Sequence, residues 1–93
     1  MKMYRTNVSN TSDFVIFEII DESLNKIDSV VINKYTPDNV LRFYRSVNDY
    51  IEEYELKMLE LVNRYEGKID YDNAMENRSS AEFILYKSVK GLQ

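Results

Sequence analysis

The sequence predicts a small α+β domain, in which an antiparallel sheet of two to three N-terminal strands packs on one long helix. Three observations favour this fold class. β-branched and aromatic residues are concentrated in the first third of the chain, a long heptad-like apolar repeat occupies the middle, and a capping sequence precedes an apolar run near the end. No linker or internal repeat interrupts the chain, so we expect one domain over residues 1–93.

The strands are expected in the first 35 residues. Residues 2–8 are consistent with an edge strand, and residues 14–20 carry apolar side chains on both faces, which favours an internal strand. Turn-forming residues occupy 21–26, and residues 27–35 alternate so that Val30 and Ile32 share one face. The segments 14–20 and 27–35 are therefore predicted to pair as an antiparallel hairpin.

The long helix is predicted over about 37–66. Thr36 can accept a hydrogen bond as N-cap, Pro37 suits the first helical position, and Gly67 can adopt the left-handed conformation that ends a helix. A helix of this length spans ~45 Å, whereas strands of seven to nine residues span only ~23 to 30 Å. We therefore expect part of the helix to extend beyond the sheet.

A short second helix is predicted over about 80–90. The spacing from Ser79 to Glu82 is that of a capping box, and apolar residues follow it. A strand is the alternative for this segment, because residues 83–86 form a short continuous apolar run that periodicity cannot assign. Residues 70–77 are polar and can form a single helical turn.

The second half of the long helix carries more apolar side chains than one covering layer needs. This predicts a possible oligomer or partner face, beside the alternative that these residues pack within the monomer. If this second apolar side is covered in either way, Leu56→Arg or Leu59→Arg should impair assembly or stability, whereas Glu53→Arg should leave the fold intact. The residues of this face are Tyr54, Leu56, Met58, Leu59, Leu61 and Tyr65.

Composition argues against an enzyme. The chain has no cysteine and no histidine, so thiol chemistry, imidazole bases and the usual zinc sites are excluded. We expect no catalytic residues, no metal and no cofactor, because no nucleophile lies beside a base and no glycine-rich loop is present. No apolar run is long enough to span a bilayer and no signal-peptide pattern begins the chain, so the expected location is the cytoplasm without membrane contact.

Charge suggests a protein partner. The chain carries a formal net charge of −4, and residues 37–66 hold seven acidic and four basic residues. An acidic stripe on a helix can occupy a basic groove of another protein. Direct nucleic-acid binding is disfavoured, since only Arg42, Arg45, Lys87 and Lys90 offer clustered positive charge. The predicted acidic face consists of Asp49, Glu52, Glu53, Glu60 and Glu66.

These observations predict a small acidic protein-interaction module that binds, and inhibits or modulates, a macromolecular partner. In length, lack of a catalytic constellation and Lys/Asn/Ile/Tyr-rich usage, the chain resembles in style the accessory proteins of phages and mobile elements. A dimeric structural or regulatory scaffold and a small nucleic-acid-binding regulator are the two alternatives.

Overall fold

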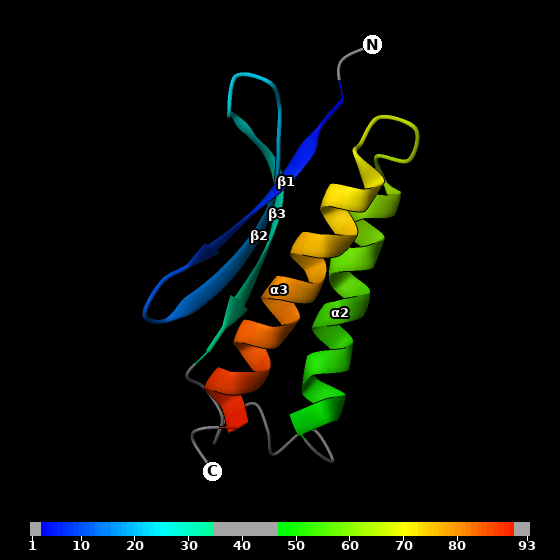
Figure 1. The fold of residues 1–93 in the computed structure, drawn as a ribbon. Coiled ribbons are helices and arrows are strands. Elements are labelled where there is room, and N and C mark those ends of the chain that lie inside the picture. The colour runs from blue at the N-terminus through cyan, green and yellow to red at the C-terminus, as the bar shows by residue number, and fades with distance from the viewer. Residues whose placement is uncertain (1–2, 35–46, 91–93) are drawn as a thin grey trace.

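The computed structural model describes residues 3–34 and 47–90, which form two layers, one of strands and one of helices (Figure 1). The sheet has the order β1-β2-β3 and is antiparallel throughout, so the predicted α+β fold class is confirmed. The elements in chain order are β1 (Arg5–Asn10), β2 (Phe14–Ile20), β3 (Lys26–Asn33), α2 (Val47–Asn63) and α3 (Tyr71–Lys90).

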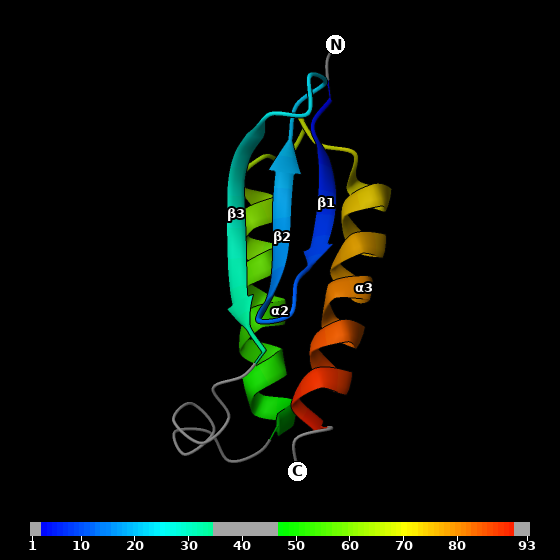
Figure 2. The same cartoon turned by 90° about the vertical axis from the view of Figure 1, so that its left-hand side faces the viewer.

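β2 is the central strand, as its composition predicted. Its side chains alternate between the two faces of the sheet, and one of these faces is buried. Val15, Phe17 and Ile19 are fully buried against the helices. On β3, Ile32 is buried on the same side, whereas Val31 is 52% exposed on the other. Figure 2 shows that no described helix lies over this second side. Within residues 3–34 and 47–90, the helices therefore cover only one of the two apolar faces of β2.

α2 is the described part of the predicted long helix. Its expected start at Thr36 and Pro37 lies outside the described residues, as does the segment on which the predicted extension beyond the sheet depends. The helix ends at Asn63, three residues before the predicted end. A turn follows in which the N–H of Lys68 donates to the carbonyl of Tyr65 at 2.8 Å, and Gly67 has the predicted positive φ, +82°.

α3 has 20 residues and begins at Tyr71, so the expectation of a short helix over about 80–90 is corrected, and the strand alternative is wrong. The physical reason lies at its N-terminus. The carboxylate of Asp70 accepts a hydrogen bond of 3.1 Å from the N–H of Asn73, and the backbone carbonyl of Asp70 accepts one of 3.0 Å from the N–H of Ala74. The serines of the expected capping box, Ser79 and Ser80, are exposed within the helix instead.

The core lies between the sheet and the helices. α3 packs against β1 and β2, while α2 packs against β3 and α3. One apolar side of α2 is thus covered by the sheet and a second by α3. The buried apolar residues are Val15, Phe17, Ile19, Ile32, Tyr50, Ile51, Met58, Leu61, Val62, Ile69, Ala74, Ala81 and Leu85.

A buried polar cluster joins β1 to α3. The N–H of Thr6 donates to Oδ1 of Asn73 at 2.9 Å, and its hydroxyl lies 3.0 Å from the same oxygen. The side-chain amide of Asn77 donates to the Thr6 hydroxyl oxygen at 2.7 Å and to its carbonyl at 3.1 Å. These contacts satisfy polar groups on a strand that would otherwise be desolvated without partners.

Candidate interaction surface

A groove runs along the pair α2 and α3: one part of it is lined by both helices and the other by α3 alone, and none of its lining residues comes from a strand. It consists of two hollows, of about 380 and 450 Å³, that share Glu82 and Tyr86. Because Glu82 and Tyr86 are one helical turn apart, they form a ridge between the hollows. We call the set of lining residues the helical groove: Asn48, Ile51, Glu52, Glu55 and Leu56 from α2, and Ser79, Glu82, Phe83 and Tyr86 from α3.

Large apolar side chains are exposed along this groove. Leu56 on α2 is 54% exposed and Phe83 on α3 is 62% exposed, and the ring of Tyr86 is also accessible. Single exposed apolar residues are common on soluble proteins, but their gathering at a hollow with polar residues beside it is typical of a binding surface.

Two carboxylates and one guanidinium meet at the base of the groove. Arg78 forms an ion pair of 2.7 Å with Glu55 across the two helices and a longer one, 3.9 Å, with Glu82 on its own helix. The Arg78 side chain is only 20% exposed, and its buried Nε has no hydrogen-bond partner among the described residues. A single cation thus serves two carboxylates, and the exposed Glu52 adds a third negative charge to the groove.

The pKa of the Glu82 carboxyl is raised first by burial and second by this excess of negative charge. Burial raises the pKa of the Glu82 carboxyl above its ordinary value of 4.5, and the neighbouring charge of Glu55 raises it further, while Arg78 opposes the shift. Lys87 lies at the rim with its ammonium 5.4 Å from the centroid of the Phe83 ring, and it is not among the lining residues. The groove itself therefore favours a cationic group.

The predicted acidic face is divided by the structure. Glu52 lines the helical groove, whereas Glu60 and Glu66 are exposed outside it. Asp49 and Glu53 are half-buried, and Glu53 pairs with Lys57 at 3.6 Å. Sequence reasoning missed Glu55 and Glu82, which belong to different helices, and no local spacing links them.

The predicted apolar face is divided as well. Met58 and Leu61 are 1% exposed in the core and are not accessible on the monomer. Tyr54 and Tyr65 pack against the core, and Leu59 is partly buried. Leu56 alone of this predicted set lines the helical groove.

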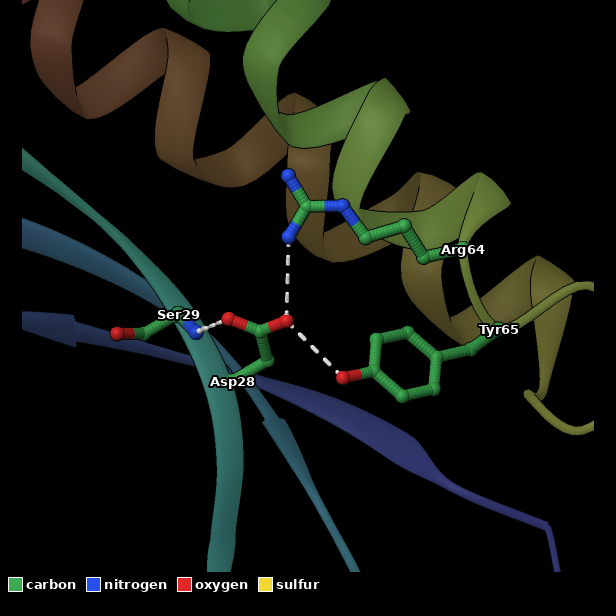
Figure 3. A network of polar contacts seen from close by, with 4 residues as sticks. All are labelled: Asp28, Ser29, Arg64 and Tyr65. Atoms are coloured by element: carbon green, nitrogen blue, oxygen red, sulfur yellow. Dashed lines mark hydrogen bonds and ion pairs between the residues drawn. The ribbon is translucent and has the colours of Figure 1, made fainter.

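A second polar network connects the sheet to the end of α2 (Figure 3). Oδ2 of Asp28 on β3 accepts hydrogen bonds from the Tyr65 hydroxyl at 3.0 Å and from Arg64 at 3.3 Å, while Oδ1 accepts one from the N–H of Ser29 at 2.9 Å. Burial, followed by the hydrogen bond to Asp28, raises the pKa of Tyr65 above its ordinary value of 10.0. This network connects the sheet to the helical layer.

The uncovered sheet face carries a second, smaller apolar area. Ile16 on β2 pairs directly with Val31 on β3, and Phe14 lies at the same end of β2. Glu18 lies two residues from Ile16 on the same face and accepts a hydrogen bond of 3.1 Å from the hydroxyl of Ser9. We call this area the open sheet face.

Other predicted features concern metals, membranes and nucleic acid. Among residues 3–34 and 47–90, no group of three or more acidic side chains is arranged to hold a metal ion, and no helix is long and apolar enough to cross a bilayer. Of the basic candidates, Lys87 is exposed on α3, whereas Arg42, Arg45 and the side chain of Lys90 lie outside the described part. Comparison of the chain with protein-family models, curated proteins and solved structures found no match.

Proposed function

We propose that this chain is an acidic protein-interaction module that binds a partner protein through the helical groove and modulates or inhibits that partner by covering a basic surface on it. The observation that carries this proposal is the combination of exposed Leu56 and Phe83 with three carboxylates in one groove. Exposed apolar area supplies favourable burial on association, and the surrounding charge selects the partner and orients it.

The proposed modulation follows from charge. A chain with a net charge of −4 is attracted to positively charged surfaces over distances of about a Debye length. Many such surfaces serve anionic ligands, so a bound acidic protein competes with those ligands for the same cations. Inhibition therefore needs no catalytic group on this chain, only a stable complex.

The absence of native cysteine provides a direct test. A single thiol introduced by Ser79→Cys, at an exposed position in the groove, can carry a photo-cross-linker without other reactive thiols in the chain. In an extract of the source cells, we expect this variant to cross-link to one discrete partner. The matched control is Ser23→Cys, which is exposed in the turn between β2 and β3 and should not cross-link to it.

Competition completes this experiment. Unlabelled wild-type chain should suppress the cross-linked product, whereas a Glu52→Lys/Glu82→Lys double variant should not. Equal products from Ser79→Cys and Ser23→Cys, or equal suppression by both competitors, would show that the groove is not the binding surface.

The open sheet face is the basis of a second and weaker candidate, a homodimeric scaffold. Phe14, Ile16 and Val31 would be covered if two copies stacked face to face. Three strands at ~4.8 Å spacing and ~24 Å length present only about 350 Å², well below the ~800 Å² per partner of a standard interface. Light scattering distinguishes the candidates, because a dimer has twice the 11.1 kDa mass of one chain and should dissociate in a Val31→Asp variant.

A further inference from the structure

We infer that the occupant of the helical groove is a cationic amphipathic helix of the partner, which places an arginine or lysine side chain among Glu52, Glu55 and Glu82. Its apolar side chains then cover Leu56, Phe83 and Tyr86. This inference rests on the proposed function and specifies the chemistry of the partner.

The shape of the groove suits a helix. α2 and α3 pack side by side, and the Glu82–Tyr86 ridge has one hollow on each side. Helices associate by placing such ridges into the spaces between side chains of the neighbouring helix. A third helix on this pair would extend the helical layer and bury apolar side chains from both of its members.

The charge of the groove defines what the helix must carry. Arg78 approaches Glu55 and Glu82 from within the protein, where its side chain is mostly buried. Glu52 lies in the same groove on the accessible side. A second cation arriving from the partner would give three carboxylates two positive charges in place of one, and would oppose the repulsion between Glu55 and Glu82, which adds to burial in raising the pKa of Glu82.

The same charges disfavour other occupants. A second copy of this acidic chain, a nucleic acid or an anionic lipid surface would bring further negative charge to the groove. Lys87 lies at the rim beside Phe83, where its ammonium can form an ion pair with an acidic residue at one end of the incoming helix. The expected helix is therefore basic along its centre, with an acidic residue permitted at that end.

The test uses a labelled synthetic amphipathic peptide of about 18 residues, ~27 Å long as a helix, with one arginine stripe and one leucine stripe. Its binding to the full chain is followed by fluorescence anisotropy. One matched peptide has glutamate in place of arginine, and another has the same composition with its helix broken by proline. We expect the first peptide to bind, with affinity that falls as salt is raised, and the other two to bind at least about tenfold more weakly.

Chain variants locate the site. Glu52→Gln removes a groove carboxylate and should weaken binding about three- to tenfold, and Leu56→Ser should weaken it similarly. Glu60→Gln removes an exposed carboxylate from the same helix outside the groove and should leave affinity unchanged. Because Glu52, Leu56 and Glu60 are all exposed, none of these changes should unfold the protein.

Three results would overturn the inference. They are equal binding of the arginine and glutamate peptides, equal binding of the helical and proline-broken peptides, and equal losses in Glu52→Gln and Glu60→Gln. If any of these occurs while Ser79→Cys still cross-links a partner specifically, the cationic helix is wrong and the proposed function stands. If the cross-link also fails, both are wrong.

Discussion

The hydroxyl of Tyr65, just beyond the end of α2, donates a hydrogen bond of 3.0 Å to Asp28 on β3, 37 positions earlier in the chain. The same carboxylate oxygen accepts a hydrogen bond from Arg64. The ring of Tyr65 also meets Tyr4 edge to face, with centroids 5.6 Å apart. Tyr65 therefore contacts β3 through its hydroxyl and the residue before β1 through its ring, beside the turn that reverses the chain between the helices.

Tyr65→Phe should lower the free energy of unfolding by about 1 kcal/mol, because it removes the hydrogen bond and keeps the ring. Urea denaturation measures this change. Arg64→Gln is the matched control, since the Arg64 side chain is 63% exposed and its ion pair should contribute less than about 0.5 kcal/mol. A larger loss in Arg64→Gln than in Tyr65→Phe would show that the ion pair, not the hydroxyl, connects the layers.

The raised pKa of Glu82 predicts a pH dependence of stability. A folded-state pKa above the ordinary value of 4.5 means that the native protein binds more protons than the unfolded chain just above that pH. Stability therefore falls as pH rises through this window. Glu82→Gln should abolish that part of the dependence, and Glu60→Gln should retain it, as followed by thermal melting at a series of pH values. Identical profiles for wild type and Glu82→Gln would contradict the raised pKa of Glu82.

Leu56 and Leu61 are only five positions apart on α2 but should respond oppositely to substitution. Leu61→Ala should cost about 2 to 5 kcal/mol of unfolding free energy, because its side chain is almost fully buried. Leu56→Arg should leave the melting temperature nearly unchanged and abolish binding of the arginine peptide, whereas the sequence-based expectation at position 56 is a loss of assembly or of stability. A large fall in melting temperature for Leu56→Arg would place this side chain in a covered interface.

Gly67→Ala should destabilise the protein by about 1 kcal/mol. The φ of +82° is strained for a residue with a β-carbon, while no atom lies within 4 Å of the position such a carbon would take. The cost is therefore conformational and not steric. Gly67→Asn should cost less, because asparagine tolerates this region better than alanine. Equal unfolding free energies for Gly67→Ala and Gly67→Asn would argue against that explanation.

Much of the fold was accessible from the sequence because its signals are local. The alternation of apolar residues identified β2 and β3, and the glycine after the long helix indicated where that helix ends. Each of these signals acts over only a few residues. The start of α3 was missed because its first two turns are mostly polar and buried Ala74 gives only a weak apolar signal. Ser79 to Glu82 imitate a capping box within a continuous helix.

The candidate surface was less accessible, for a different reason. Whether an apolar helix residue is exposed depends on which neighbour covers it, and for α2 this is decided by the packing of both β3 and α3 against it. The helical groove depends on Glu55 and Glu82 converging on Arg78, an arrangement that exists only once the two helices have packed. The sequence indicated an acidic surface on α2, but could not distinguish Glu52 in the groove from Glu60 outside it.

The bonds from Thr6 to Asn73 and Asn77 also bear on the order in which the protein folds during synthesis. A ribosome releases β1 long before the residues that satisfy the polar groups of Thr6, whereas β1 can pair with β2, and β2 with β3, as soon as each pair has emerged. Contacts so distant in sequence form late, because a long loop must close first. In the nascent chain, Thr6 on β1 therefore lacks its hydrogen bonds to Asn73 and Asn77 until α3 has been made.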